Sequence, residues 1–220
     1  MTSDAPYRRI RFWPWLVLGV IAITLLGLRL IAGRVEGPEL PVLGQVPAFS
    51  LFDQRGETYQ LDDLTGHVWI ASFIYTTCPG PCPRVVQRMA EVARRLGPEP
   101  DLRLVSFSVD PQSDTPEVLA VYGKTHAIDA ERWKLLTGPA AEVLSLVQKG
   151  FMSAVARSDE SDAERLAAEG PIVHSIRLTL VDRSSRLRGF YDSSDPADIE
   201  RLIGDTRKLL RSVAASETGG

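Results

Sequence analysis

The two cysteines of this 220-residue chain, Cys78 and Cys82, are separated only by Pro-Gly-Pro. The apolar run that precedes them, residues 67–75, predicts a buried strand, and residues 84–96 have the apolar spacing of an amphipathic helix. The cysteines are therefore expected at a strand-to-helix junction. A thiol at the N-terminus of a helix lies at the positive end of the helix dipole, which lowers its pKa and favours a reactive or metal-binding thiolate.

The spacing of the two cysteines bears on which chemistry they perform. A disulfide between residues four apart closes a very short loop, so it would add little stability, which argues against a purely structural bridge. Thioredoxin-type redox proteins carry two residues between their cysteines, whereas this chain carries three. In a helical segment, positions i and i+4 lie about 5–6 Å apart at Cβ, wider than the roughly 3.5–4.5 Å of a disulfide. The spacing of the pair therefore favours a shared metal ion. A disulfide between the two cysteines remains an alternative if the backbone adjusts.

Two thiolates select Cu(I) or zinc among biological metals, and a structural zinc site usually needs four ligands. Three-coordinate Cu(I) needs one donor more, and the chain has three histidines. His67 begins a predicted strand and is expected at the surface, while His126 follows a predicted helix as a solvated cap. His174 lies on an alternating strand and shares a face with Ile176, Leu178 and Leu180. From the residues alone, a half-buried core histidine and a metal ligand both fit His174.

The periodicity of the remaining chain predicts an α/β fold, with helices on both faces of one sheet and a closing hairpin. The segments 68–75 and 102–109 are expected to be adjacent and parallel. Residues 157–170 are polar and are expected to form an exposed insertion. The other expected elements are a hairpin at 48–57, helices at 114–124, 140–149 and 196–213, and strands at 133–136, 175–181 and 187–191.

The N-terminal region has the composition of a membrane anchor. Residues 12–28 carry no charge, and the apolar stretch extends to Ala32 past Arg29. We expect a cytoplasmic tail at 1–11, a single transmembrane helix at 12–32, a linker at 33–46, a folded domain at 47–212 and a flexible tail at 213–220. The arginines before the span favour a cytoplasmic N-terminus and a translocated domain. The expected location is a bacterial inner membrane, with the C-terminal domain in the periplasm.

The charge distribution argues against nucleic-acid binding. The formal net charge is −3, and it becomes −6 after residue 32, because residues 1–32 hold four arginines and one acidic residue. A nucleic-acid-binding domain usually presents a basic surface. We therefore expect no nucleic-acid partner.

Three blocks of this sequence resemble motifs of the SCO/SenC family of copper chaperones for cytochrome c oxidase assembly. The segment Thr-Thr-Cys-Pro-Gly-Pro-Cys-Pro at 76–83 resembles the family's T-x-C-P-x-x-C-P signature. Residues 108–116 resemble its S-V-D-P-x-x-D-T-P block. Residues 173–175 resemble its V-x-H-S/T segment. The resemblance runs from about residue 47 to 210 with the blocks in the family's order, and the family usually has an N-terminal anchor.

This resemblance implies a thioredoxin-like fold with copper bound by Cys78, Cys82 and His174, as Cu(I) or alternatively as Cu(II). The implied role is copper delivery to the copper-accepting subunit of cytochrome c oxidase. A thiol reductase that keeps the cysteines reduced, and a second copper chaperone, are implied partners. The family commonly has an acidic residue directly before the histidine, where this chain has Val173.

Two functions lead at this point, and an anchored peroxiredoxin-like or interaction domain ranks after them, because the sequence shows no setting for a peroxidatic cysteine. The first is a copper chaperone without turnover of its own. The second is a membrane-anchored thiol–disulfide oxidoreductase that reduces the cysteines of the oxidase copper site. Both use Cys78 and Cys82, and only the first requires His174.

Overall fold

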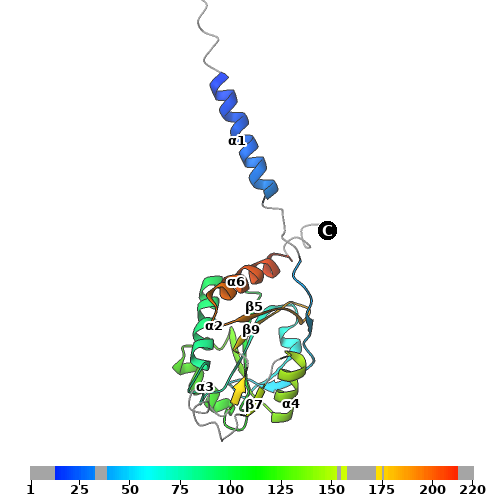
Figure 1. The fold of residues 1–220 in the computed structure, drawn as a ribbon, viewed down its shortest axis with the longest axis vertical. Helices are drawn as coiled ribbons and strands as arrows, with labels where there is room; N and C mark the ends of the chain where they lie inside the picture. The colour runs from blue at the N-terminus through cyan, green and yellow to red at the C-terminus, as the bar shows by residue number, and fades with distance from the viewer. Residues whose placement is uncertain (1–12, 33–38, 153–154, 158–171, 175, 213–220) are drawn as a thin grey trace, which may run out of the picture. The chain divides into compact units, whose positions relative to one another are not determined.

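The computed structural model describes residues 13–32, 39–152, 155–157, 172–174 and 176–212 (Figure 1). The predicted tails at 1–11 and 213–220 and most of the predicted insertion at 157–170 lie outside these residues. The elements are α1 Trp13–Ala32, β1 Gly44–Gln45, β2 Ser50–Phe52, β3 Thr58–Gln60, the 3₁₀ helix η1 Leu61–Leu64, β4 Val68–Ile74, α2 Cys82–Leu96, β5 Leu102–Ser108, α3 Pro116–Thr125, β6 Trp133–Leu136, α4 Ala140–Ser145, the π-helical turn η2 Leu146–Gly150, β7 Val155–Arg157, β8 Ile172–His174, β9 Arg177–Val181, β10 Arg186–Asp192 and α6 Pro196–Arg211.

The main sheet has six strands in the order β1-β10-β9-β4-β5-β6. Strands β4, β5 and β6 are parallel, and β9 runs antiparallel to β4 and to β10. The expected pairing of 68–75 with 102–109 is confirmed, because β4 and β5 pair along their whole length from Val68 opposite Leu102 to Ile74 opposite Ser108. The predicted hairpins β2–β3 and β9–β10 are also confirmed.

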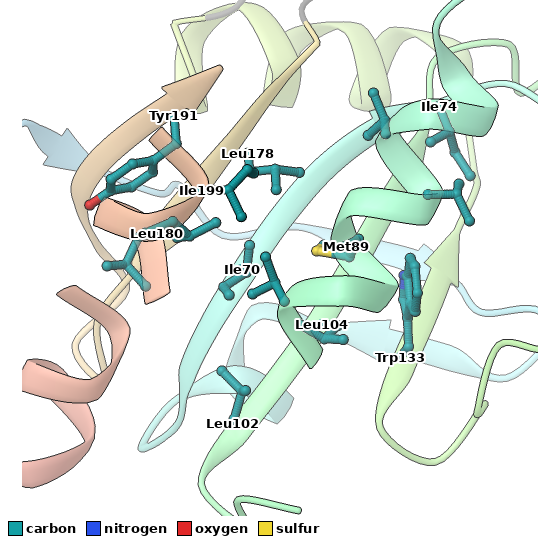
Figure 2. Close-up of a cluster of buried hydrophobic side chains, with 14 of the residues drawn as sticks. Ile70, Ile74, Met89, Leu102, Leu104, Trp133, Leu178, Leu180, Tyr191 and Ile199 are labelled. Carbon is teal, nitrogen blue, oxygen red and sulfur yellow. The ribbon is translucent and has the colours of Figure 1, made fainter. Parts of the chain in front are cut away.

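One face of the sheet is covered by α2, α3 and α6. Alternate residues of β4 and β5 point toward this layer, where they meet the apolar stripe of α2. Figure 2 shows Met89 of α2 with Ile70 and Leu104 of the central strands, all three almost completely buried. Leu178 and Leu180 of β9 and Ile199 of α6 extend the same cluster. Both cysteines also belong to this layer, which we call the α2 layer.

The opposite face is covered by the β2–β3 hairpin, η1, α4 and η2. The alternate residues of β4, Trp69, Ala71 and Phe73, point to this side. Phe151 packs edge-on against Phe73, with ring centroids 5.2 Å apart. Because both faces are covered, the central strands are mostly apolar, and the hydroxyls of Ser72 and Ser106, which interrupt them, hydrogen-bond to each other at 2.7 Å.

The folded unit begins earlier than the sequence indicated. The expected linker at 33–46 overlaps it, because the chain forms one compact unit from Leu40 onward and Gly44 and Gln45 form the edge strand β1 beside β10. Buried Arg188 of β10 donates hydrogen bonds to the carbonyl oxygens of Leu40 and Pro41. A Pro- and Gly-containing segment resembles a linker in composition, but long-range pairing with β10 orders its second half.

Helix α1 covers the segment expected to form the anchor. Within the described parts of the chain, no helix combines the length and the apolar character that a bilayer span requires. The transmembrane anchor therefore stays a prediction.

Candidate functional site

The two cysteines lie where β4 turns into α2. Cys82 is the first residue of α2, and Cys78 lies in the preceding bend, where its N–H donates to the carbonyl oxygen of Tyr75 at 3.3 Å. Pro81 takes the cap position in helical geometry, and its carbonyl oxygen accepts hydrogen bonds from the first turn of the helix. The cysteines lie at the expected strand-to-helix junction, but the Cβ separation given for a helical segment does not apply to them, because the helix begins only at Cys82. The cysteines form no disulfide in this structure, and both are buried.

The electrostatics of Cys82 differ from the expectation for a thiol at a helix N-terminus. A hydrogen bond with Cys78 and burial both raise the pKa of Cys82 well above its ordinary value, and a backbone hydrogen bond from Tyr75 offsets them only partly. The hydrogen bond with Cys78 and burial in the α2 layer thus keep the pKa of Cys82 above its ordinary value, contrary to the lowering expected from the helix dipole. The metal-free pair is a protonated thiol in hydrogen-bond contact with a second sulfur. A metal ion that binds here must displace the proton from Cys82.

A buried carboxylate anchors the loop that carries Cys78. Asp114, which is fully buried, accepts hydrogen bonds from the Thr76 N–H at 3.1 Å and from the Thr76 hydroxyl at 2.5 Å. It also accepts from the Ser108 hydroxyl, at the end of β5, at 2.6 Å. Burial raises the pKa of Asp114, and these hydrogen bonds counteract the shift. Asp114 therefore connects the chain just before Cys78 to the neighbouring strand.

The sequence alone does not show this role of Asp114, because residues 114–117 predict a helix start and the 108–116 motif does not say what the carboxylate contacts. Thr115 is the N-cap, and its side chain accepts from the N–H of Val118. Because Thr115 already caps the helix, Asp114 is not needed as a cap. A second capping-type residue next to Thr115 was therefore a sign in the sequence that the Asp114 carboxylate binds a different part of the chain.

The sheet topology brings three distant segments to one edge. Because β4 and β5 are parallel, the loops that follow them, with Cys78 and Asp114, leave the sheet at the same end. Strand β9 is antiparallel to β4, and Ala71 lies opposite Thr179, so β9 starts level with the last residues of β4. The chain that enters β9, including His174 three residues before its start, therefore approaches the edge where the cysteines lie. Ile176 packs against the α2 layer that contains both cysteines.

His174 belongs to a different strand from the one that the sequence predicts. It is the last residue of β8, and its backbone is paired with Val155 of β7 in a separate two-stranded sheet. The interpretation that His174 continues the strand of Leu178 and Leu180 is wrong, because β9 begins only at Arg177. The side chain of His174 lies outside the described residues. Among the side chains that the structure does describe, no group of three His, Cys, Asp or Glu residues could hold a metal ion.

The other two histidines lie at the start of β4 and at the C-terminus of α3. His67 directly precedes β4, at the opposite end of that strand from the cysteines, and burial lowers its pKa. It is half-buried rather than at the open surface that was expected. His126 caps the C-terminus of α3 as predicted, and its ring lies 4.2 Å from the ring of Tyr122.

Together, a central β-sheet covered by helices and a cysteine pair between the first parallel strand and its helix define a thioredoxin-like protein. Residues 43–211 match the SCO1/SenC family, and the chain belongs to this family. It is 27% identical over 169 residues to the SCO1 protein homolog of Bacillus subtilis, which covers 76% of this chain and 83% of the relative.

Solved structures show the same fold. The structure of BsSco, described as having a disulfide switch and as a member of the Sco family of cytochrome c oxidase assembly proteins, has a TM-score of 0.66 and 27% identity, covering 79% of this chain and 98% of BsSco. ScoI of Bradyrhizobium japonicum, solved with copper bound, has a TM-score of 0.62 and 23% identity, covering 75% of this chain and 99% of that one. The prediction of a thioredoxin-like Sco-family fold is confirmed.

Proposed function

We propose that this protein is a copper carrier that binds one copper ion through Cys78, Cys82 and His174 and serves the assembly of cytochrome c oxidase. The observation that carries this proposal is the buried cysteine pair in hydrogen-bond contact at the sheet edge where the chain bearing His174 enters β9. Two soft sulfurs and one imidazole favour Cu(I), and the same donors also accept Cu(II). Membership of the SCO1/SenC family and the copper in the Bradyrhizobium japonicum ScoI structure support this proposal.

A second candidate function is thiol–disulfide exchange. The hydrogen bond between Cys78 and Cys82 brings the two sulfurs close together, and BsSco, which has the same fold, has a disulfide switch. Oxidation of the pair to a disulfide would remove the thiolate ligands and release copper. Both candidate functions therefore use the same pair of cysteines, as thiols or as a disulfide. Only the copper carrier requires His174, so this residue distinguishes the two functions.

The distinguishing experiment is copper titration of the reduced full-length chain. We expect about one copper per chain. We also expect His174→Ala to weaken copper binding by roughly 10–100-fold or more. Loss of a residue that only hydrogen-bonds to a metal ligand already weakens binding by roughly 10–100-fold, and this substitution removes a ligand itself. Competition with a Cu(I) chelator of known affinity measures the change. The His174→Ala chain should still form the Cys78–Cys82 disulfide, which thiol quantification before and after oxidation would establish.

The matched control is His67→Ala, because His67 lies at the opposite end of β4 from the thiols. It should bind copper as the unmodified chain does. Unchanged copper affinity in His174→Ala would refute the three-ligand site and leave thiol–disulfide exchange as the better function.

The proposed partners follow from the chemistry of the site. Copper loading requires both cysteines to be reduced, so in an oxidising compartment a thiol reductase must act on the pair. The copper acceptor is proposed to be the copper-binding subunit of the oxidase, and the donor a second copper chaperone. The proposed location is the periplasmic face of a bacterial inner membrane, with residues 12–32 as a single-pass anchor, based on the uncharged run 12–28 and the arginines that precede it.

A reporter fusion after Gly220 tests this topology. We expect alkaline phosphatase fused there to be active and a cytoplasm-dependent fluorescent reporter to be dark, because the arginine cluster retains the N-terminus inside. Deletion of residues 12–32 provides the control and should reverse both signals. Phosphatase activity that is absent in the full-length fusion, or full-length protein that is recovered without detergent, would contradict the proposed anchor.

A further inference from the structure

The turn that follows β5 folds back over the end of that strand. The N–H of Asp114 donates to the carbonyl oxygen of Asp110 at 2.9 Å, and the N–H of Asp110 donates to the Ser108 hydroxyl at 3.1 Å. The same hydroxyl donates to the Asp114 carboxylate at 2.6 Å. Ser108 is the last residue of β5 and lies opposite Ile74, the last residue of β4. The turn therefore holds the Asp114 carboxylate beside the ends of both strands.

From there the carboxylate reaches the loop that carries Cys78. The Thr76 N–H donates to its two oxygens at 3.1 and 3.3 Å, and the Thr76 hydroxyl donates to one of them at 2.5 Å. The N–H of Cys78 donates to the carbonyl oxygen of Tyr75, so residues 75–78 form a tight turn with Thr76 at its second position. Asp114 thus fixes the turn that places Cys78.

The attachment lies in a buried environment. Asp114 is fully buried, and each of its contacts is that of an acceptor, which an ionised carboxylate has the capacity to satisfy. In such an environment water does not replace a lost partner, so removal of one donor or of the acceptor leaves a buried polar group unsatisfied. The hydrogen bonds to Thr76 are therefore strong enough to decide the conformation of the loop.

Cys78 depends on this attachment more than Cys82 does. Cys82 is the first residue of α2 and is held by the packing of that helix in the α2 layer. Cys78 lies between β4 and α2, so the loop itself sets its position relative to Cys82 and shields it from solvent. A loop released from Asp114 would leave Cys82 in place and allow Cys78 to move.

We propose that Asp114 is a positioning residue for the copper site: supported by Ser108 and bonded to Thr76, it holds Cys78 where it can share a metal ion with Cys82. This inference rests on the proposed function. Asp114 acts through the loop, since its oxygens accept from Thr76 and Ser108. A ligand that is already ordered before the metal arrives spares the conformational entropy of ordering it on binding. The attachment therefore raises the affinity for copper.

The test measures copper affinity of the reduced full-length chain by competition with a Cu(I) chelator. Thr76→Val removes the hydroxyl donor and keeps the branched shape, and it should weaken copper binding about tenfold, as loss of a hydrogen bond to a charged group does. Thr76→Ser restores the hydroxyl and should bind copper as the unmodified chain does. Asp114→Asn should weaken binding at least as much as Thr76→Val. If Asp114→Asn does not fold, the two Thr76 variants decide.

Asp53→Asn is the matched control. Asp53 is also buried and accepts from three donors, the N–H groups of Arg55 and Glu57 and the Lys134 ammonium. It lies in the β2–β3 hairpin, which covers the opposite face of the sheet. Asp53→Asn should lower the midpoint of urea unfolding as Asp114→Asn does, yet leave copper affinity unchanged. Equal copper affinities in Asp114→Asn and Asp53→Asn would mean that Asp114 stabilises the fold alone, and would overturn the proposal.

A second measurement needs no copper. In the reduced, metal-free chain, iodoacetamide should alkylate Cys78 severalfold faster in Thr76→Val and in Asp114→Asn, because release of the loop exposes this thiol. Thr76→Ser and Asp53→Asn should match the unmodified chain, with mass spectrometry of the peptides identifying the modified cysteine. If the unmodified chain binds no copper, the proposed function fails, and the alkylation rates still decide whether Asp114 positions Cys78. The same Cys78 rate in every chain would refute the positioning role.

Discussion

The Cys82→Ser chain is expected to lose copper affinity by more than about a hundredfold, beyond the roughly 10–100-fold that loss of an outer-shell partner causes. Serine replaces a soft sulfur ligand with a hard hydroxyl that does not ionise at neutral pH, and Cu(I) selects soft thiolates. Cys82 is fully buried and begins α2, so no other described side chain can move into its position without displacing the helix start. Competition with a Cu(I) chelator measures the loss, and Cys78→Ser should behave in the same way.

The control for this substitution is Met89→Leu. Met89 is a second buried sulfur on the same helix and in the same layer, but it packs among Ile70 and Leu104 rather than at the helix start. A volume-conserving change there costs little stability and should leave copper binding intact. Circular dichroism of both variants would establish that the fold is retained. Retention of stoichiometric, tight copper binding by folded Cys82→Ser would refute the cysteine ligands and the proposed function with them.

The central sheet was predictable because the sequence of each central strand has a recognisable apolar pattern. The segments of β4 and β5 are short apolar runs bounded by turns, and two such runs joined through a helix form adjacent parallel strands. The edge strand β1 was not predictable in the same way. It contains only Gly44 and Gln45, and its partner β10 follows more than 140 residues later. A two-residue strand has no periodicity to read, so composition alone indicated a linker.

The residue types of the candidate site were predictable, and its geometry only partly. Two cysteines four positions apart are chemically distinctive in any local conformation, so the sequence motif singled out Cys78 and Cys82 as candidates. The raised pKa of Cys82 could not be predicted, because it comes from the hydrogen bond with Cys78 and from burial, which only the folded structure shows. The contacts of Asp114 were missed for a related reason. The 108–116 block includes this residue, but its hydrogen bonds to Thr76 are made in the tertiary structure and cannot be read from the motif.

A buried ion pair anchors the start of the folded unit to the final hairpin, and its loss should produce the largest change in stability. Arg188 and Asp182 are almost completely buried, and an Arg188 guanidinium nitrogen donates to the Asp182 carboxylate at 2.7 Å. Arg188 also donates to the carbonyl oxygens of Leu40 and Pro41. Asp182 in turn accepts from the N–H groups of Ser184 and Arg186 in the turn between β9 and β10. This ion pair thus connects the turn of the β9–β10 hairpin to Leu40 and Pro41, at the start of the folded unit.

Asp182→Asn should lower the free energy of unfolding by about 3–5 kcal/mol, because it removes the charge of a buried carboxylate that is paired with buried Arg188. Asparagine keeps the shape and one acceptor oxygen, so the effect reports the charge rather than a cavity. The double variant Asp182→Asn with Arg188→Met should recover part of the loss, since an apolar replacement of both partners is often close to neutral. Glu131→Gln, in the exposed pair Arg55–Glu131, is the control and should change stability little. Urea denaturation measures all four chains.

The pH dependence supplies an independent check on the same pair. Burial raises the pKa of Asp182, but hydrogen bonds from Arg188, from two backbone N–H groups and from Arg186 outweigh it, and the pKa is lowered from its ordinary value of 3.8. For an acid with a lowered folded-state pKa, the stabilisation is complete above the unfolded value and is lost as pH falls through the folded value. The gap in stability between the unmodified chain and Asp182→Asn should therefore be widest near neutral pH and narrow below about pH 3.8. A gap that stays constant from neutral pH into strong acid would mean that the carboxylate charge does not stabilise Arg188, and the anchoring role of the pair would then rest on shape alone.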